Sequence, residues 1–469
     1  MSLIFKTIQT EGIAELSYLV GDDSSGTAAV IDPTPDVEKY LELARKKNLS
    51  ITHIFETHIH ADLVSGAREL ADRLGTADIF LSGEEATDYG FDCVKTSEGD
   101  RFTFGDTRLT VRHTPGHTPE HVSYELASED EPDMPWGVLT GDSLFVGSAG
   151  RPDLLGEDET EELTEKLFHT LRDYYLELPD GTIIFPAHGH GSPCGADIGD
   201  RLTSTIGYER ETNAFLQYDK LEDFKEFVLS GTPPVPTYYP RMKEVNQEGP
   251  EVLGALPNVM ALTPEDFSKA LEEDVQLIDT RDMLAFGGGH IDGAMNIGSS
   301  PMMSIWAGWL LDPDKPILLV LESDGELETV VKRFLRTGYT EFAGYLAGGI
   351  SSWIEAGKEL SHAGETDVHA LRKIVKDKAS KAQIIDVRSP SEWDDGHIPG
   401  AQHFFLPELR EKSGDLDKSL PVLTYCASGY RASIAASILL QEGFEDVNNV
   451  PGSWKAWKAA GFEIEEEDS

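Results

Sequence analysis

The stretch ITHIFETHIHAD, residues 51–62, places an apolar run directly before three polar side chains that can bind a metal. These are His58, His60 and Asp62, and residues two apart in an extended chain point to the same side. A helical pattern, LVSGARELADRL, follows them, so the segment predicts a strand, a polar loop and a helix in succession. Ligand-type side chains at the end of a strand are typical of the functional site in a layered α/β fold.

Three more loops of the first half carry side chains of the same kind. HTPGHTPEH contains His113, His117 and His121, and its Pro-Gly turn favours His117 as the one at the loop. LTGDSLF and FPAHGHG place Asp142 and His188 each at the end of an apolar strand. A lone histidine is more often structural, but four loops that each deliver a His or an Asp predict a metal site.

The composition narrows the classes of partner. The chain has 469 residues and a formal net charge of −45, with 84 Asp plus Glu against 39 Lys plus Arg. This charge repels phosphates and anionic headgroups, so neither nucleic acid nor a membrane is expected as a partner. The start of the chain has no signal-peptide pattern, and a cytoplasmic location is expected. The acidic residues are spread along the chain, as in proteins of a salt-rich cytoplasm.

The second half contains an internal repeat. Residues 275–297 match residues 383–404 in a strand, an Asp-x-Arg and a Gly-His-Ile-x-Gly-Ala turn. Residues 316–339 match residues 421–444 without a gap. Each copy alternates apolar strands with helical patterns, which predicts an α/β fold with a parallel sheet.

A proline-rich stretch, residues 231–252, is the best candidate for a linker after the first half. The chain is several times the usual size of one core. With the repeat, this predicts a multidomain α/β protein with domains at about 1–250, 255–362 and 366–469.

The segment TYCASGYRAS holds a cysteine loop in the last copy. Between Cys426 and Arg431 the loop can curl so that backbone N–H groups point at the sulfur. These groups, the following helix N-terminus and Arg431 would stabilise a thiolate, which a sulfur carrier needs. In the middle copy Leu321 stands opposite Cys426 and Glu326 opposite Arg431, so that copy is predicted to be catalytically silent.

The motifs T-H-I-H-A-D, T-P-G-H-T, T-G-D-S-L-F and P-A-H-G resemble the metallo-β-lactamase superfamily over about residues 1–230. That resemblance implies an αββα sandwich. GDSLFVGSAGRPDL, residues 141–154, is similar to the persulfide dioxygenase branch of the superfamily. It implies one Fe(II) per chain held by His58, His117 and Asp142. It also implies that three further residues orient ligands and water, namely His60, Asp62 and His188.

The number and kind of metal also follow from the residues. Many members of the superfamily end the first motif with a histidine that binds a second ion, and this chain has Leu63 there. Leucine cannot bind a cation, which favours one metal. Two His and one Asp with open positions form the facial triad of non-haem Fe(II) oxygenases. The alternative is that His60 also ligates, in a zinc hydrolase with three histidines.

Two residues near these loops are candidates for substrate binding. Arg151 is assigned to the anionic end of the substrate, because a guanidinium binds carboxylate bidentately; a salt bridge with Asp153 is the alternative. Cys194 lies six residues past His188. It could receive or present a sulfane sulfur, or be a buried inert thiol; Cys93 is expected to be structural. Glutathione-using relatives carry a tyrosine after P-A-H, where this chain reads GHGSPCG, so glutathione is not favoured.

The last copy resembles the rhodanese family over the whole of residues 366–469. The motifs are Asp386-Val-Arg388, Gly396-His-Ile-Pro-Gly400 and the closing GSWKAWKAAG. The resemblance implies rhodanese-like domains with central parallel sheets and a sulfurtransferase that uses Cys426 and Arg431. Related phosphatase loops have one more residue between Cys and Arg, so the shorter loop here favours sulfur over an oxyanion.

Together the resemblances imply a bifunctional enzyme of sulfide detoxification. A low-molecular-weight thiol persulfide would be oxidised with O2 to sulfite, and Cys426 would pass a sulfane sulfur to sulfite to give thiosulfate. The alternative is a glyoxalase II-like metal thioester hydrolase fused to a rhodanese, and a third reading makes the rhodanese modules sulfur-binding sensors. The identity of the thiol stays open, as does a homo-oligomeric state.

Overall fold

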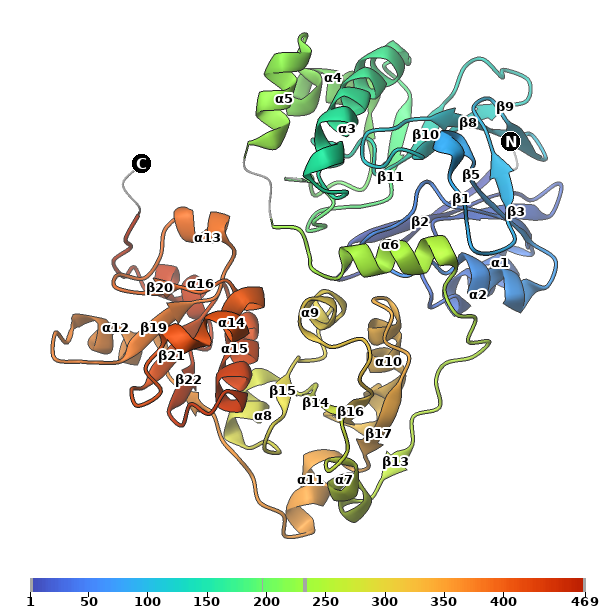
Figure 1. Cartoon of the computed structure of the whole chain (residues 1–469). Coiled ribbons are helices and arrows are strands. Elements are labelled where there is room, and N and C mark those ends of the chain that lie inside the picture. Colours follow the sequence, from blue (N-terminus) through green and yellow to red (C-terminus); the bar gives the residue numbers. More distant parts are fainter. Residues whose placement is uncertain (1–2, 196, 231–233, 467–469) are drawn as a thin grey trace. The chain divides into compact units, whose positions relative to one another are not determined.

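The computed structural model describes residues 3–195, 197–230 and 234–466 (Figure 1). The chain forms two compact units. The first comprises Met1–Leu256 with Phe334–Gly338, and the second comprises Pro257–Arg333 with Tyr339–Ser469. The second unit contains both copies of the repeat, each with its own sheet. The three-domain division stays a prediction.

Two six-stranded sheets form the first unit, in the orders β1-β2-β3-β4-β5-β6 and β12-β11-β10-β9-β8-β7. The strands of the first sheet are β1 (Leu3–Thr10), β2 (Glu15–Asp22), β3 (Thr27–Ile31), β4 (Ser50–Phe55), β5 (Asp78–Ser82) and β6 (Val94–Thr96). Those of the second are β7 (Arg101–Phe104), β8 (Thr107–His113), β9 (Val122–Ser128), β10 (Gly137–Gly141), β11 (Ile183–Pro186) and β12 (Ser204–Thr205). Both sheets are mixed: β3 to β6 pair in parallel, and β10 pairs in parallel with β11.

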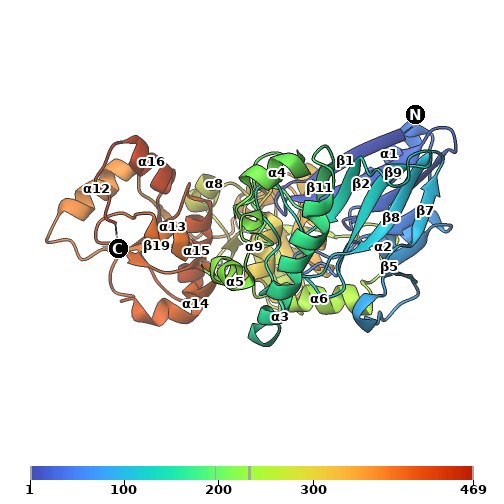
Figure 2. The same cartoon turned by 90° about the horizontal axis from the view of Figure 1, so that it is seen from above.

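The sheets of the first unit share one apolar core and are covered by helices on their outer faces. Phe55 of one sheet and Tyr124 of the other belong to this shared core. Helices α1 (Glu38–Lys47) and α2 (Ala67–Leu74) pack on the first sheet. Three more helices gather beside β11 in both views (Figures 1 and 2), namely α3 (Glu157–His169), α4 (Ile206–Thr212) and α5 (Leu221–Leu229). The layers run helix, sheet, sheet, helix, which confirms the predicted αββα sandwich.

Part of the predicted linker forms a helix that packs on the first unit. Residues 231–233 lie outside the described residues, but Tyr239–Glu248 form helix α6 with Tyr239, Met242 and Asn246 buried. Pro240 stands in the first turn, where a proline costs no hydrogen bond. The prolines were therefore compatible with a helix, and the buried residues pack this helix against the first unit.

The second unit contains two five-stranded sheets whose strand orders correspond position by position: β13-β17-β16-β14-β15 and β18-β22-β21-β19-β20. All of their strand pairs are parallel, as predicted. The strands of the middle copy are β13 (Ala261–Leu262), β14 (Gln276–Asp279), β15 (Met295–Asn296), β16 (Ile317–Val320) and β17 (Phe342–Leu346). Those of the last copy are β18 (Gly364–Glu365), β19 (Gln383–Asp386), β20 (Gln402–His403), β21 (Val422–Tyr425) and β22 (Val447–Asn449).

Helices connect these strands in both copies. The middle copy has α7 (Pro264–Ala270), α8 (Met283–Gly288), α9 (Met303–Leu310), α10 (Leu327–Leu335) and α11 (Gly349–Glu355). The last copy has α12 (Val368–Lys376), α13 (Pro390–Asp394), α14 (Leu409–Lys412), α15 (Tyr430–Gln441) and α16 (Ser453–Ala459). Among the described residues, no helix combines the length and apolar character needed to cross a membrane.

The repeated Asp-x-Arg motif is a buried structural ion pair. In the last copy Arg388 contacts Asp386 at 2.5 Å and donates to the Gly396 carbonyl at 2.8 Å. The middle copy has the same bonds, since Arg281 contacts Asp279 at 2.6 Å. A buried charge is tolerated only when paired and hydrogen-bonded, and here the pair ties a strand end to the Gly-His-Ile turn. The middle copy therefore keeps the fold without the cysteine.

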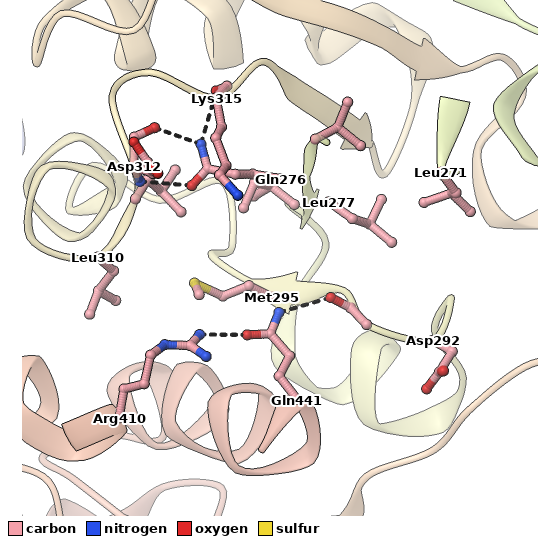
Figure 3. Close-up of a pocket in the computed structure, with 14 residues that line it drawn as sticks. Leu271, Gln276, Leu277, Asp292, Met295, Leu310, Asp312, Lys315, Arg410 and Gln441 are labelled. Atoms are coloured by element: carbon pink, nitrogen blue, oxygen red, sulfur yellow. Dashed lines mark hydrogen bonds between the residues drawn. The ribbon is translucent and has the colours of Figure 1, made fainter. Parts of the chain in front are cut away.

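The two copies contact each other within the second unit. Gln441 of the last copy donates to the Gly293 carbonyl of the middle copy at 2.8 Å, and the same Gln441 side chain accepts from Arg410 at 2.7 Å (Figure 3). The buried Ser433 hydroxyl donates to Asn296 at 2.5 Å. Helix α15 of the last copy thus packs on the Gly-Ala turn and β15 of the middle copy.

Candidate functional site

The candidate metal ligands follow directly on strand ends in the first unit. The THIHAD loop begins two residues after β4, and Asp142 comes immediately after β10. Gly141 has a φ of +53°, and a Cβ there would lie 2.4 Å from the His121 ring. Only glycine fits this turn without strain, and the turn brings Asp142 next to the histidines.

The ligand atoms of His58, His117 and Asp142 lie within 4.8 Å of one another and are buried. Nε2 of His58 is 3.7 Å and Nε2 of His117 is 3.5 Å from Oδ2 of Asp142. These three atoms have no hydrogen-bond partner. Buried polar atoms without a partner cost free energy, and three that converge on one point are what a metal ion would satisfy. The residues present therefore fit a metal.

Protonation in this group also suits a metal. Burial lowers the pKa of both His58 and His117, so their imidazoles are neutral at physiological pH and offer a lone pair. Burial opposes ionisation of Asp142, but the charge and hydrogen bond of His188 outweigh it and hold the pKa of Asp142 well below its usual value. The set thus provides two neutral donors and one anionic donor.

The other atom of each candidate ligand is hydrogen-bonded. His117 Nδ1 donates to the Arg151 carbonyl at 3.0 Å, and His58 Nδ1 contacts the Thr57 hydroxyl at 2.9 Å. Oδ1 of Asp142 accepts from His188 Nδ1 at 2.7 Å. Such outer contacts select the tautomer and orient the ligand towards a metal.

A second buried group lies beside the first. The ligand atoms of Asp62, His188 and Cys194 lie within 4.8 Å of one another. His188 bridges the two groups, since its Nε2 contacts Asp62 at 2.8 Å. Burial raises the pKa of Cys194 well above its usual value, so the side chain is a neutral thiol. The structure thus places Cys194 next to His188, as the sequence spacing suggested, and outside the group of His58.

His60 lies next to His58 but faces other carboxylates. Its Nε2 is 3.0 Å from Glu56 and 3.3 Å from Asp32. Glu15, Asp32 and His60 form a further buried group, and Glu15 also contacts His188 at 3.0 Å. Sequence reasoning missed the carboxylates of Glu15, Asp32 and Glu56. An Asp-Pro after the apolar run AAVI was a signal for Asp32, but nothing nearby in the sequence marked Glu15 or Glu56.

Arg151 forms the salt bridge with Asp153 that the sequence analysis gave as the alternative to substrate binding. Its guanidinium is bound bidentately by Asp153, at 2.6 and 2.7 Å, and is 4% exposed. A role with substrate stays a prediction.

Of the neighbouring histidines, His121 accepts from the Asp142 amide at 3.0 Å, whereas His113 contacts the Pro119 carbonyl at 2.9 Å and lies outside the metal group.

Asn246 of α6 holds the THIHAD loop in place. Its amide donates to the carbonyls of His60 and Leu63 at 2.8 and 2.7 Å and accepts from the Ser65 amide at 2.8 Å. Asn246→Ala leaves all three backbone groups unpaired, so we expect a loss of about 2–4 kcal/mol in the free energy of unfolding and roughly tenfold weaker metal binding. Urea denaturation and metal titration measure both. Glu244→Ala, at an exposed position of the same helix, is the control and should change neither; equal effects of the two variants would contradict the prediction.

The cysteine loop of the second unit forms between β21 and α15. Cys426 is buried, and the Gly429 amide donates to its sulfur at 3.1 Å. The Ser453 hydroxyl accepts from the Cys426 amide at 3.1 Å. Arg431 is bound bidentately by Glu392, at 2.6 and 2.8 Å. The loop thus supplies an N–H donor to the sulfur and a guanidinium held in one orientation.

Glu392 is a second residue that sequence reasoning missed. It belongs to a capping box with Ser389 at the start of α13. The Ser-Pro-Ser-Glu spacing was a signal for the cap but not for the contact with Arg431. In the middle copy Ala285 stands opposite Glu392, and Leu321 is fully buried. The middle copy thus lacks the cysteine and also both residues that correspond to the Glu392–Arg431 ion pair.

Comparison with known proteins agrees with the two-part organisation. Residues 11–188 match the metallo-beta-lactamase superfamily, and residues 263–356 and 367–460 each match the rhodanese-like domain. A metallo-beta-lactamase from Staphylococcus aureus subsp. aureus COL is 33% identical, with 74% of this chain and 99% of that one covered and a TM-score of 0.67. The chain therefore belongs to the metallo-beta-lactamase superfamily, with two rhodanese-like domains in its second half, which confirms the resemblance.

Relatives of two enzyme types match somewhat less than half of the chain. The mitochondrial persulfide dioxygenase ETHE1 of Bos taurus is 30% identical over 42% of this chain and 69% of its own. The cytoplasmic hydroxyacylglutathione hydrolase of Arabidopsis thaliana is 30% identical over 44% of this chain and 85% of its own. Because the identities are equal, they do not choose between the two reactions, and the choice depends on the residues of the site.

Proposed function

We propose that this chain is an iron-dependent persulfide dioxygenase joined to a sulfurtransferase. One observation carries the proposal: the unpaired ligand atoms of His58, His117 and Asp142 converge in a buried group, while the position of the missing histidine holds the buried Leu63. Two imidazoles and one carboxylate with open positions suit Fe(II) and O2, whereas thioester hydrolysis in this superfamily is better served by a pair of ions.

The residues around the group have separable roles. His58, His117 and Asp142 would hold one ferrous ion, which when bound supplies the redox chemistry of O2 with a persulfide sulfur. His188 keeps Asp142 ionised and turned inward by its hydrogen bond. Asp62, in contact with His188, restrains the other side of that imidazole. Burial of the whole group excludes bulk water, which favours oxidation of the bound substrate over hydrolysis.

The transfer step belongs to Cys426. Its thiolate attacks the terminal sulfur of a persulfide R–S–SH, so that a new S–S bond forms, the old one breaks and R–S⁻ leaves. The Gly429 amide stabilises the charge on the Cys426 sulfur, and Arg431 adds a fixed positive charge. Sulfite then attacks the outer sulfur of the deprotonated Cys426 persulfide, and thiosulfate leaves with the Cys426 thiolate restored.

The test is anaerobic purification with metal quantification, followed by O2 uptake with a small-thiol persulfide. One iron per chain and O2 consumption are expected, with the sulfite that forms converted to thiosulfate by Cys426. Two zinc ions per chain and release of acid from a glutathione thioester would instead support the hydroxyacylglutathione hydrolase reading. The absence of O2 uptake from iron-loaded protein would end the dioxygenase proposal.

Removing the partner of Arg431 should slow sulfur transfer. The ion pair with Arg431 outweighs burial and lowers the pKa of Glu392 from 4.5 to about 2, so the pair is intact at neutral pH and its stabilisation is lost only as the pH falls from 4.5 towards 2. Glu392→Gln frees the guanidinium, and we expect about tenfold slower transfer from Cys426 to sulfite with O2 uptake unchanged. Stopped-flow assay of thiosulfate measures it; the exposed Glu411→Gln is the control, and equal rates would contradict the prediction.

A further inference from the structure

The loops of the two repeat copies face one cavity of about 410 Å³ within the second unit. Ser428 and Tyr430 of the cysteine loop line it from the last copy. Glu322 and Glu326, in the corresponding loop of the middle copy, also line it, as does Asp282. The loop of the middle copy, which lacks a cysteine, therefore lines the same cavity as the Cys426 loop.

This cavity lies close to the reactive sulfur. Met283 lines it, and a Cβ on Gly429 would lie 2.8 Å from the Met283 sulfur. Gly429 is the residue whose amide donates to Cys426, and the next residue, Tyr430, donates to the Gly298 carbonyl at 2.9 Å. Gly429 thus neighbours both the Cys426 sulfur and Met283 of the cavity wall.

The larger cavity between the copies, of about 570 Å³, has no such connection (Figure 3). It is lined by residues such as Met295, Leu310 and Gln441, and none of its lining residues among the described part of the chain belongs to either loop. The smaller cavity is therefore the one that the Cys426 loop lines.

The charge of the smaller cavity comes from the middle copy. Asp282, Glu322 and Glu326 are its charged lining residues, and the last copy contributes only neutral side chains, including Ser428 and Tyr430. The guanidinium of Arg333 donates to the lining residue Ser299 at 2.6 Å, but Arg333 is not itself a lining residue. Carboxylates attract a cation and repel an anion across such a space.

We propose that the middle copy is the specificity-determining wall of the sulfur carrier, and that Asp282, Glu322 and Glu326 select persulfides whose organic part carries an ammonium group over those that carry a carboxylate. The volume suits the organic part of a small thiol. This inference rests on the proposed transfer through Cys426. It assigns a function to the copy that lacks a nucleophile, since Glu326 replaces the arginine of the active loop by a group of opposite charge.

The test compares the loading of Cys426 by two persulfides of opposite charge in the full-length protein. Cysteamine persulfide carries an ammonium group and mercaptoacetate persulfide carries a carboxylate. Loading under anaerobic single-turnover conditions is followed by mass spectrometry. The unchanged chain should prefer cysteamine persulfide, and Glu322→Gln with Glu326→Gln should lower the ratio of the two rates roughly tenfold at low salt.

A matched control removes the same charge elsewhere in the middle copy. Glu272→Gln with Glu273→Gln alters two exposed glutamates that do not line the cavity, and the ratio should not change. The neutral persulfide of 2-mercaptoethanol reports on the loop itself and should load Cys426 at the same rate in all three proteins. An unchanged ratio in the cavity variant, or an equal slowing of all three persulfides, would overturn the charge selection. Failure of every persulfide to load Cys426 in the unchanged chain would overturn the transfer function instead.

Discussion

His117→Ala should reduce the iron content to a small fraction of one per chain and O2 uptake by at least about a thousandfold. The substitution removes one of three converging ligand atoms and leaves Asp142 and His58 without the geometry that holds an ion. Because His117 has no exposed surface, the variant is also checked for folding by circular dichroism. Plasma mass spectrometry gives the metal content, and an oxygen electrode gives the uptake.

His113→Ala is the matched control for this variant. His113 lies four residues before His117, at the end of β8, is half-buried and contacts the Pro119 carbonyl outside the metal group. We expect it to keep one iron and at least half of the O2 uptake. If His117→Ala retained iron and activity at the level of His113→Ala, the assignment of the ligands would be wrong.

Cys426→Ser should change the product from thiosulfate to sulfite and leave O2 uptake as it is. A serine oxygen keeps the size of the loop but cannot hold a sulfane sulfur, so transfer should fall by at least about a thousandfold. O2 uptake is expected to persist because the candidate metal group lies in the other compact unit of the chain. Ion chromatography of sulfite and thiosulfate after a fixed O2 consumption measures the ratio.

Cys93→Ser controls for the loss of a thiol as such. Cys93 is half-buried, packs beside the apolar core under the first sheet and lies in no ligand group. We expect its product ratio to equal that of the unchanged chain. Thiosulfate formed at an unchanged rate by Cys426→Ser would remove Cys426 from the mechanism and leave the dioxygenase proposal standing.

Much of the fold and many of the candidate site residues could be predicted, because the sequence patterns that specify them are local. Alternating apolar strands and helical patterns specify the layers, and the repeat predicts two copies of one fold, which the corresponding strand orders of β13–β17 and β18–β22 confirm. The residues at strand ends, among them His58 and Asp142, stood out because chemistry in layered α/β folds collects there. The opposite charge of Glu326 and the absence of a nucleophile at Leu321 were likewise visible from the ungapped match.

Tertiary structure decided the contacts between segments far apart in the chain. The sequence contained Asp32, Glu56 and Asn246, but their contacts with the THIHAD loop exist only once the sheets and α6 have packed. The same is true of Glu392 with Arg431 and of the cavity that both loops share. The sequence by itself determined the folds of the parts and the residue types available for chemistry. Which carboxylate meets which imidazole or guanidinium was decided by packing, because burial makes an ion pair strong only where the folded backbone brings its two members together.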